Sequence, residues 1–246
     1  MQVNLFPITL IEAFMISPNV KHFIFGAEKS PAFNYLPGQF ITIHFERENK
    51  VLKRSYSIAN APMQDNRIEF AAGYVENGPG TELLFNLAPG DTININGPFG
   101  RLILKDDLPK RYILAATSTG VTPYRAMIPE LKNRLVENPT LKIVIMLGVQ
   151  TAEDALYAEE FAAFSDLYPQ QVSFRLQLSR ATDWDSNAHQ FKGYVQQAFP
   201  EIMLNPLEDV VYLCGNPGMI DAAFEDLKAQ GFTMQQIIRE KYISAR

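Results

Sequence analysis

The chain has 246 residues, of which 47% are hydrophobic and 20% charged, and its formal net charge is −5. This composition is typical of a globular protein with enough apolar residues for a core, and the acidic balance with only short Lys/Arg clusters excludes a dedicated nucleic-acid binder. The single cysteine, Cys214, excludes both an internal disulfide and a four-thiolate iron–sulfur cluster within the chain.

The length exceeds the ~100–200 residues of a usual domain, so two domains are expected. The amino-terminal residues lack a basic segment followed by a long apolar one. No run approaches the about 18 apolar residues of a membrane helix. We therefore expect a cytoplasmic protein that does not insert into a membrane, and we expect it to be a monomer.

The first part of the chain, from Leu5 to about Gly97, consists of short apolar segments separated by turn residues. Several alternate apolar and polar residues with period two, which predicts β-strands. No long crossover segment separates them, so an antiparallel β-barrel is expected rather than a parallel sheet. A short helix is predicted near Thr81–Leu87. The expected strands are Val20–Phe25, Gln39–Phe45, Ser55–Ala59, Ile68–Tyr74 and Thr92–Asn96.

After Gly100 the pattern changes to apolar strands that alternate with helical stretches, which is typical of a parallel α/β sheet with crossover helices. The expected domains are therefore 1–102, a β-barrel, and 103–246, an α/β domain. The predicted strands are Tyr112–Ala116, Lys142–Leu147, Val172–Leu178 and Val210–Leu213. The predicted helices are Pro123–Leu135, Ala152–Phe164, Phe191–Phe199 and Met219–Gln230.

The densest chemical motif is Arg54-Ser55-Tyr56-Ser57-Ile58-Ala59-Asn60. It is preceded by Tyr35-Leu36-Pro37-Gly38-Gln39-Phe40 and followed by Gly80-Thr81 and Gly97-Pro98-Phe99-Gly100. This series resembles the ferredoxin–NADP reductase superfamily, whose R-x-Y-S motif lies on a barrel strand and holds the flavin. The resemblance implies a first domain that binds FAD.

The resemblance also implies flavin contacts for Arg54, Tyr56, Ser57 and Ile58, with the Ser57 hydroxyl near flavin N5, where hydride arrives. On a strand, Arg54 and Tyr56 share one face and Ser57 lies on the other. Tyr56 offers an aromatic face to the flavin ring, and Arg54 offers a planar fork of donors to phosphates. Taken singly, Tyr56 could equally be a half-buried strand aromatic and Arg54 a surface charge.

Gly80-Thr81 opens the predicted short helix, whose amino-terminal amides and positive dipole end suit a phosphate. The Thr81 hydroxyl would add a donor, although it could serve only as a helix cap.

A loop of small residues, Thr117-Ser118-Thr119-Gly120-Val121-Thr122-Pro123, joins a predicted strand to a predicted helix. Dinucleotides bind at the carboxyl ends of strands in open α/β folds, where backbone amides approach the pyrophosphate. Thr117, Thr119 and Gly120 are therefore predicted nucleotide contacts. Many such turns bind nothing, and family members usually have more glycine here than this chain has at Thr117 and Ser118.

The segment Cys214-Gly215-Asn216-Pro217-Gly218-Met219 closely resembles the family motif C-G-[PN]-P-x-M. The resemblance implies that Cys214 borders the nicotinamide beside flavin N5, and that Gly215, Pro217 and Met219 belong to the same site. A buried structural cysteine before a helix is the alternative. A nucleophilic role for Cys214 is not expected, because no histidine forms a recognisable triad pattern with it.

Ser179-Arg180 follows a predicted strand at the position where NADP-using relatives hold the adenosine 2′-phosphate. An arginine suits that dianion, so NADPH is favoured over NADH. Where the family often has a second arginine, this chain has Lys192-Gly193-Tyr194, and a plain surface arginine remains the alternative for Arg180.

Near the carboxyl end, Glu240-Lys241-Tyr242 resembles the terminal E-x-Y pattern of several ferredoxin–NADP reductases, in which an aromatic residue covers the flavin. The resemblance implies that Tyr242 stacks on the flavin and that Glu240 hydrogen-bonds near the nicotinamide or relays a proton. Four residues follow Tyr242 here, and an edge-strand tyrosine with a solvated glutamate is the alternative.

The resulting hypothesis is an FAD enzyme that passes electrons between NADPH and a one-electron carrier such as ferredoxin or flavodoxin. Arg47, Lys50 and Lys53 could steer an acidic carrier. Two alternatives stay open. One is an NAD(P)H:flavin or quinone reductase, and the other is a non-catalytic flavin- or nucleotide-binding regulatory subunit, which the altered Thr117-Ser118 loop favours.

Overall fold

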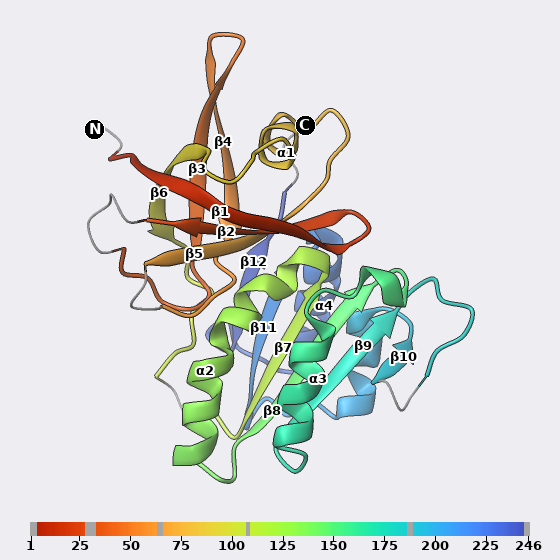
Figure 1. Cartoon of the computed structure of the whole chain (residues 1–246). Coiled ribbons are helices and arrows are strands. Elements are labelled where there is room, and N and C mark those ends of the chain that lie inside the picture. The colour runs from red at the N-terminus through yellow and green to blue at the C-terminus, as the bar shows by residue number, and fades with distance from the viewer. Residues whose placement is uncertain (1–3, 28–32, 63–65, 107–108, 186–188, 244–246) are drawn as a thin grey trace. The chain divides into compact units, whose positions relative to one another are not determined.

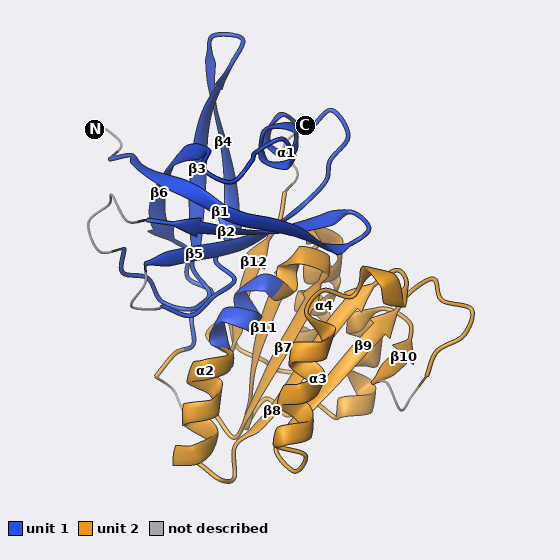
Figure 2. Ribbon diagram, viewed as in Figure 1, with its two compact units in different colours: residues 1–104, 122–127, 245–246 blue, residues 105–121, 128–244 orange. Residues whose placement is uncertain are grey.

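The computed structural model describes residues 4–27, 33–62, 66–106, 109–185 and 189–243. The chain divides into two compact units (Figure 2). Unit 1 comprises Met1–Leu104, Thr122–Met127 and Ala245–Arg246, and unit 2 comprises Lys105–Val121 and Ile128–Ser244. Within the described residues, no helix is both long and apolar enough to cross a membrane.

Unit 1 is built on a six-stranded antiparallel sheet with the strand order β4-β3-β6-β1-β2-β5 (Figure 1). The chain just after β4 meets β5, because Ile58 bridges to Phe70 and the Ala59 amide donates to the Glu69 carbonyl at 2.7 Å. This contact joins the two edges of the sheet, so the predicted antiparallel barrel is confirmed. The elements are β1 (Phe6–Ser17), β2 (Val20–Gly26), β3 (Phe40–Arg47), β4 (Lys50–Ser57), β5 (Arg67–Gly73), α1 (Pro79–Phe85) and β6 (Thr92–Phe99).

The core of unit 1 follows from the period-two pattern of its strands. Phe23, Phe25 and Phe70 are fully buried, and the rings of Phe25 and Phe70 stack at 5.4 Å. Strands β3 and β4 are joined by a two-residue turn in which Glu48 and Asn49 have φ angles of 51° and 61°. Turns with positive φ at both central residues match the natural twist of a hairpin, so β3 and β4 pair along their whole length.

Unit 2 is a six-stranded parallel sheet with the order β10-β9-β8-β7-β11-β12 and helices on both of its faces (Figure 1). Because both faces are covered, β8 and β11 are almost entirely buried and read as continuous apolar runs. The predicted α/β fold of the second half is confirmed. The strands are β7 (Arg111–Thr117), β8 (Lys142–Val149), β9 (Val172–Leu178), β10 (Gln190–Lys192), β11 (Asp209–Gly215) and β12 (Ile237–Lys241), and the helices are α2 (Thr122–Glu137), α3 (Ala158–Leu167) and α4 (Pro217–Ala229).

Two of the helix predictions in this half are wrong in part. The segment Phe191–Phe199 is not a helix: it contributes β10 and a 3-10 turn at Val195–Ala198, separated by Gly193 with φ +113°. That left-handed backbone interrupts any helix, and Phe191 pairs with the edge of the sheet instead. Within Ala152–Phe164 the helix starts only after Tyr157, whose φ is 54°.

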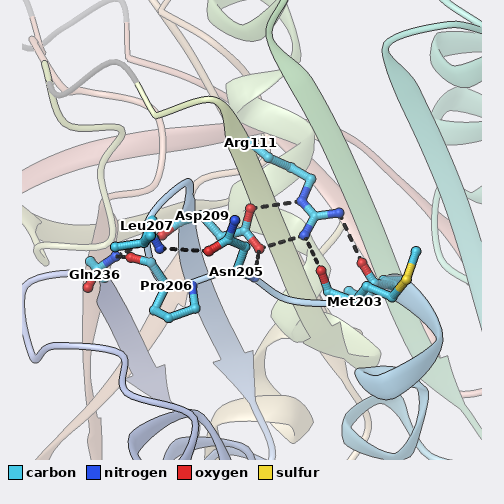
Figure 3. A network of polar contacts seen from close by, with 8 residues as sticks. Arg111, Met203, Asn205, Pro206, Leu207, Asp209 and Gln236 are labelled. Carbon is cyan, nitrogen blue, oxygen red and sulfur yellow. Dashed lines mark hydrogen bonds and ion pairs between the residues drawn. The ribbon is translucent and has the colours of Figure 1, made fainter.

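At the amino ends of β7 and β11, one polar network fixes the two strands together (Figure 3). Arg111 donates to both carboxylate oxygens of Asp209 at 2.8 and 2.6 Å, and to the carbonyls of Ile202 and Met203. Asp209 is 1% exposed. The network thus fixes the end of the sheet at which these two strands begin. The predicted nucleotide residues lie at the opposite end, after the carboxyl ends of the strands.

Candidate functional site

The predicted flavin residues lie at the carboxyl end of β4. Arg54 is paired with Ile43 and Tyr56 with Ile41, both core residues of β3, whereas Ser57 is paired with Phe40 on the opposite face. The Tyr56 ring stacks on Phe70 with centroids 5.0 Å apart. Burial raises the pKa of Tyr56 to about 12, against the opposing charge of Arg54, so the phenol is neutral at physiological pH.

Helix α1 approaches this strand at Gly80. A Cβ atom at Gly80 would lie 2.7 Å from Arg54 Cγ and 3.3 Å from the Tyr56 hydroxyl. The backbone of the helix therefore touches both side chains through a position that only glycine fits. The Arg54 stem, the Tyr56 hydroxyl and the helix backbone meet here, and the Arg54 guanidinium donates to the Lys53 carbonyl at 2.8 Å. Guanidinium, phenol and backbone amide donors are suited to phosphate oxygens.

The side chains of Thr81 and Ile58, which were predicted to contact the cofactor, make other contacts. The Thr81 hydroxyl donates to the carbonyls of Val75 and Gly78 and accepts from the Val75 amide, so it holds the loop before α1. The Ile58 side chain is fully buried in the core of unit 1. The Ile58 side chain is therefore not available to a ligand, and its amide already donates to the Gln39 carbonyl at 3.0 Å. Ser57 is 5% exposed.

In unit 2, the predicted nucleotide loop follows β7 directly and packs against the loop that follows β11. A Cβ at Gly120 would lie 2.4 Å from the Cys214 carbonyl oxygen and 2.7 Å from the Gly215 Cα. The Asn216 amide donates to the Thr117 hydroxyl at 2.9 Å. The structure thus brings two motifs together that are about a hundred residues apart in the sequence. Ser118 is exposed and Thr119 half-buried beside them.

The second loop is built as the start of helix α4. The Asn216 side chain caps the helix by accepting from the amides of Gly218 and Met219, and Pro217 occupies the first turn, where no amide partner is needed. Gly215 has φ +118°, which favours glycine. The Met219 side chain is 6% exposed and packs into the core of unit 2, so it anchors the start of α4 to that core.

The carboxyl-terminal strand β12 lies beside this loop. Glu240 is paired with Cys214 in the parallel register, and the Tyr242 amide donates to the Gly215 carbonyl at 2.8 Å. Burial and the charge of Glu240 raise the pKa of Cys214 well above its usual value, although a side-chain hydrogen bond with Tyr242 opposes them. The thiol is therefore neutral, which fits a packing role and not a nucleophile.

Ser179 and Arg180 lie directly after β9. The Ser179 hydroxyl donates to the Val149 carbonyl at 3.1 Å, and the Arg180 amide donates to the Gln150 carbonyl at 2.9 Å, so the backbone of this turn is fixed while the Arg180 side chain is exposed. Sequence reasoning did not assign a role to Trp184, which is 46% exposed and lies beneath the Lys192 ammonium at 5.5 Å.

These two units define a class of protein: an oxidoreductase with a flavin domain followed by a nicotinamide-nucleotide domain. Residues 7–103 match the family model described as an oxidoreductase FAD-binding domain, and residues 114–225 match the oxidoreductase NAD-binding domain. The chain belongs to the ferredoxin–NADP reductase superfamily. The predictions of FAD and of a nicotinamide dinucleotide are confirmed at this level.

The relatives support the same conclusion along the whole chain. Ferredoxin–NADP reductase B of Sorangium cellulosum is 29% identical over 250 residues, covering 98% of this chain and 99% of the relative. The electron transfer component of toluate 1,2-dioxygenase from Pseudomonas putida is 27% identical, covering 88% of this chain but 62% of the relative. The fold is also that of a ferredoxin–NADP⁺ reductase from Neisseria gonorrhoeae, solved with bound FAD and NADP, with a TM-score of 0.83, 20% identity and coverage of 98% and 99%.

Proposed function

We propose that this protein transfers electrons between NADPH and a one-electron carrier of the ferredoxin or flavodoxin type, through an FAD held by unit 1. The observation that carries the proposal is the contact of Gly80 with Arg54 and Tyr56, which joins a helix start to the flavin strand. When bound, FAD accepts two electrons as a hydride and passes them on singly, which links a nicotinamide to a one-electron carrier.

The residues of unit 1 have distinct tasks in this proposal. Arg54, with the backbone at Gly80, binds the phosphates of FAD, and the Tyr56 ring supports the flavin from one face. The Ser57 hydroxyl offers a hydrogen bond near the reacting end of the flavin. Because Tyr56 keeps its proton over the whole physiological range, its hydroxyl can donate to FAD without a change of charge.

In unit 2, the loop at Thr117–Gly120 binds the pyrophosphate, and Cys214 and Gly215 line the nicotinamide position. Close backbone packing between the two loops supports this assignment, because it leaves the amides of the first loop next to the wall formed by the second. Glu240, in register with Cys214, is assigned to hydrogen-bond near the nicotinamide. Tyr242 follows directly after β12 and is assigned to cover the flavin.

NADPH is the proposed nucleotide in preference to NADH. The exposed Arg180 side chain extends from a turn whose backbone is fixed by two hydrogen bonds that need no bound ligand. Lys192 lies at the same end of the sheet, since it is paired with Leu178, the last residue of β9 and two residues before Arg180. Two cations at one strand end suit the dianionic 2′-phosphate that distinguishes NADPH.

The carrier would dock on the hairpin β3–β4. Lys50 and Lys53 are both exposed on β4, whereas Arg47 donates to Glu82 at 2.7 Å and is already partly neutralised. The two lysines therefore supply most of the free positive charge of this hairpin for an acidic carrier.

Anaerobic stopped-flow mixing of the FAD-loaded protein with NADPH or NADH tests the proposal. Flavin absorbance should bleach with NADPH faster than with NADH, and subsequent addition of oxidised ferredoxin or flavodoxin should restore it. A protein that releases its flavin after each turnover would instead be a flavin reductase. A yellow protein that never bleaches would be a regulatory subunit, and comparable rates with the two nucleotides would contradict the role of Arg180.

A further inference from the structure

The end of the flavin motif is held by contacts that none of the proposed roles uses. The Ala59 carbonyl accepts from Arg125 Nη1 at 3.1 Å, and its amide donates to the Glu69 carbonyl at 2.7 Å. The Asn60 side chain accepts from the Glu69 amide at 2.9 Å and donates to the Arg67 carbonyl at 3.0 Å. The position of Ala59 and Asn60 is therefore set by β5 and by one arginine from another element.

Arg125 also forms an ion pair with Glu69 in the interior of unit 1. Its Nη1 lies 2.9 Å from Glu69 Oε2, which His22 Nε2 approaches to 3.3 Å, and the three side chains are 23%, 13% and 2% exposed. Burial acts to raise the pKa of Glu69, but hydrogen bonds from His22 and Arg125 and the charge of Arg125 outweigh it, so the pKa is lowered. The carboxylate stays ionised and keeps the guanidinium in one orientation.

Arg125 is part of the helix that the nucleotide loop opens. Helix α2 starts at Thr122, directly after the 3-10 turn Ser118–Val121, and Arg125 lies in its first turn. Residues Thr122–Met127 group with unit 1 although the rest of α2 groups with unit 2, as the two colours of this helix show (Figure 2). One side chain thus connects the start of this helix to β5 and to the end of the flavin motif at Ala59.

Stability alone is a weak explanation for this pair. The cost of removing two charges from water offsets most of their attraction, so a buried ion pair contributes little net stability and acts mainly on geometry. Hydride transfer is sensitive to geometry, because the reacting atoms must approach to about 3–3.5 Å and a misplacement of about 1 Å can cost about 10²-fold in rate.

We propose that Arg125 is a positioning residue for hydride transfer, which acts through Ala59 and Glu69 to fix the end of the flavin motif with respect to the start of α2. This inference rests on the proposed function. Arg125 itself contacts neither ligand in this role. Its loss should therefore affect the rate of flavin reduction and leave the binding of NADPH unaffected.

The test compares Arg125→Met and Arg125→Lys with the wild type in anaerobic single-turnover reduction of the FAD-loaded protein by NADPH. For Arg125→Met, we expect the limiting rate to fall by about tenfold or more, while the apparent Kd for NADPH stays within about twofold. Arg125→Lys should recover part of the rate, because its ammonium can still pair with Glu69. Lys110→Met removes an exposed ion pair, with Lys110 74% exposed, and should leave both quantities unchanged.

A limiting rate for Arg125→Met within about twofold of the wild type would overturn the inference. A lower rate that only follows loss of bound FAD, or an equal loss of NADPH affinity, would also overturn it, because either result describes a purely structural residue. If Arg125→Met does not fold, Glu69→Gln removes the partner charge with little change in shape and is judged by the same criteria. A wild-type protein that NADPH does not reduce would instead contradict the proposed function.

Discussion

At Gly80, a Cβ would lie 2.7 Å from Arg54 Cγ and 3.3 Å from the Tyr56 hydroxyl, so any side chain there would displace the Arg54 stem. The substitution Gly80→Ala would push the Arg54 stem aside and weaken the charge-assisted bonds to a phosphate that we propose for Arg54, each worth about 1.5–3 kcal/mol. We therefore expect FAD affinity to fall by about tenfold or more. Titration of the apoprotein with FAD, followed by the quenching of flavin fluorescence, measures the change.

The control for this prediction is Gly73→Ala in β5, where a Cβ would meet only Val20 Cγ2 at 3.9 Å. Alanine in place of glycine within a helix favours folding by about 0.5–1 kcal/mol. The loss of FAD affinity in Gly80→Ala should therefore not be accompanied by a comparable loss of stability. Equal FAD affinity in the two variants would contradict the phosphate-binding role.

A second prediction concerns the Cys214 thiol and the pH dependence of the free energy of unfolding. Its pKa in the folded protein is raised well above 9.0, the usual value, by burial and by Glu240. The neutral thiol contributes stability that is fully present below the unfolded pKa and is lost as the pH rises toward the folded pKa. Above about pH 9, the free energy of unfolding should therefore fall more steeply in the wild type than in Cys214→Ala, by up to about 1.4 kcal/mol per pH unit.

Urea unfolding of both proteins at several pH values between about 8 and 10 checks this slope. Native Cys214 should also resist alkylation by iodoacetamide and react only after unfolding, since the thiolate is the reactive form. Parallel slopes in the two proteins, or rapid alkylation of the native protein, would show that the thiol is not held neutral.

Among the elements, β7 and β11 depend on the ion pair between Arg111 and Asp209 (Figure 3). The substitution Arg111→Met leaves a carboxylate that is 1% exposed without its cation, and such a loss costs about 3–5 kcal/mol. We expect the urea midpoint of unit 2 to fall accordingly. NADPH affinity of the folded fraction should be retained, because the ion pair lies at the amino ends of these strands and the nucleotide loops follow their carboxyl ends. A large loss of NADPH affinity without loss of stability would contradict this separation.

The sequence predicted most elements because their patterns are local. Period-two alternation and buried apolar runs identify strands such as β2 and β8, and Pro123 and Pro217 mark helix starts. The errors come from elements that other segments decide. Phe191–Phe199 has an apolar spacing typical of a helix, but pairing with β9 and the backbone at Gly193 give a strand and a turn.

The candidate site was predictable to the same degree. The motifs at Arg54 and Cys214 are contiguous in the sequence, so their residues could be named in advance. The contact of Gly120 with Cys214 and that of Arg125 with Glu69 join segments far apart in the chain, and no local pattern encodes them. The Thr81 hydroxyl was likewise predicted to donate to a phosphate, but it hydrogen-bonds to the backbone carbonyls of Val75 and Gly78.

For the molecule as a whole, the net charge and the local charge of the hairpin β3–β4 have opposite effects on an acidic carrier. The net charge is −5, which would repel an acidic carrier, so a local positive area is needed to bring such a carrier in. In the proposed function, Lys50 and Lys53 of the hairpin β3–β4 supply it, because Glu82 already neutralises Arg47. The exposed Glu46 and Glu48 of the same hairpin offset part of the lysine charge. Unpaired charges at a rim act mainly on association rates, and salt screens them over about 10 Å at 0.1 M.

Combined substitution of Lys50→Gln and Lys53→Gln should therefore lower the second-order rate of carrier reduction by about three- to tenfold at low ionic strength. The dependence of that rate on salt should also become shallower, since fewer charges remain to be screened. Lys228→Gln removes one positive charge from α4 of unit 2 and serves as the control, with an expected effect below about twofold. Stopped-flow reduction of the carrier between about 0.01 and 0.5 M salt measures both quantities, because the Debye length falls from about 30 Å at 0.01 M to well below the dimensions of the hairpin. If the double variant keeps the salt dependence of the wild type, the carrier docks elsewhere, and the hairpin is only a solvated surface.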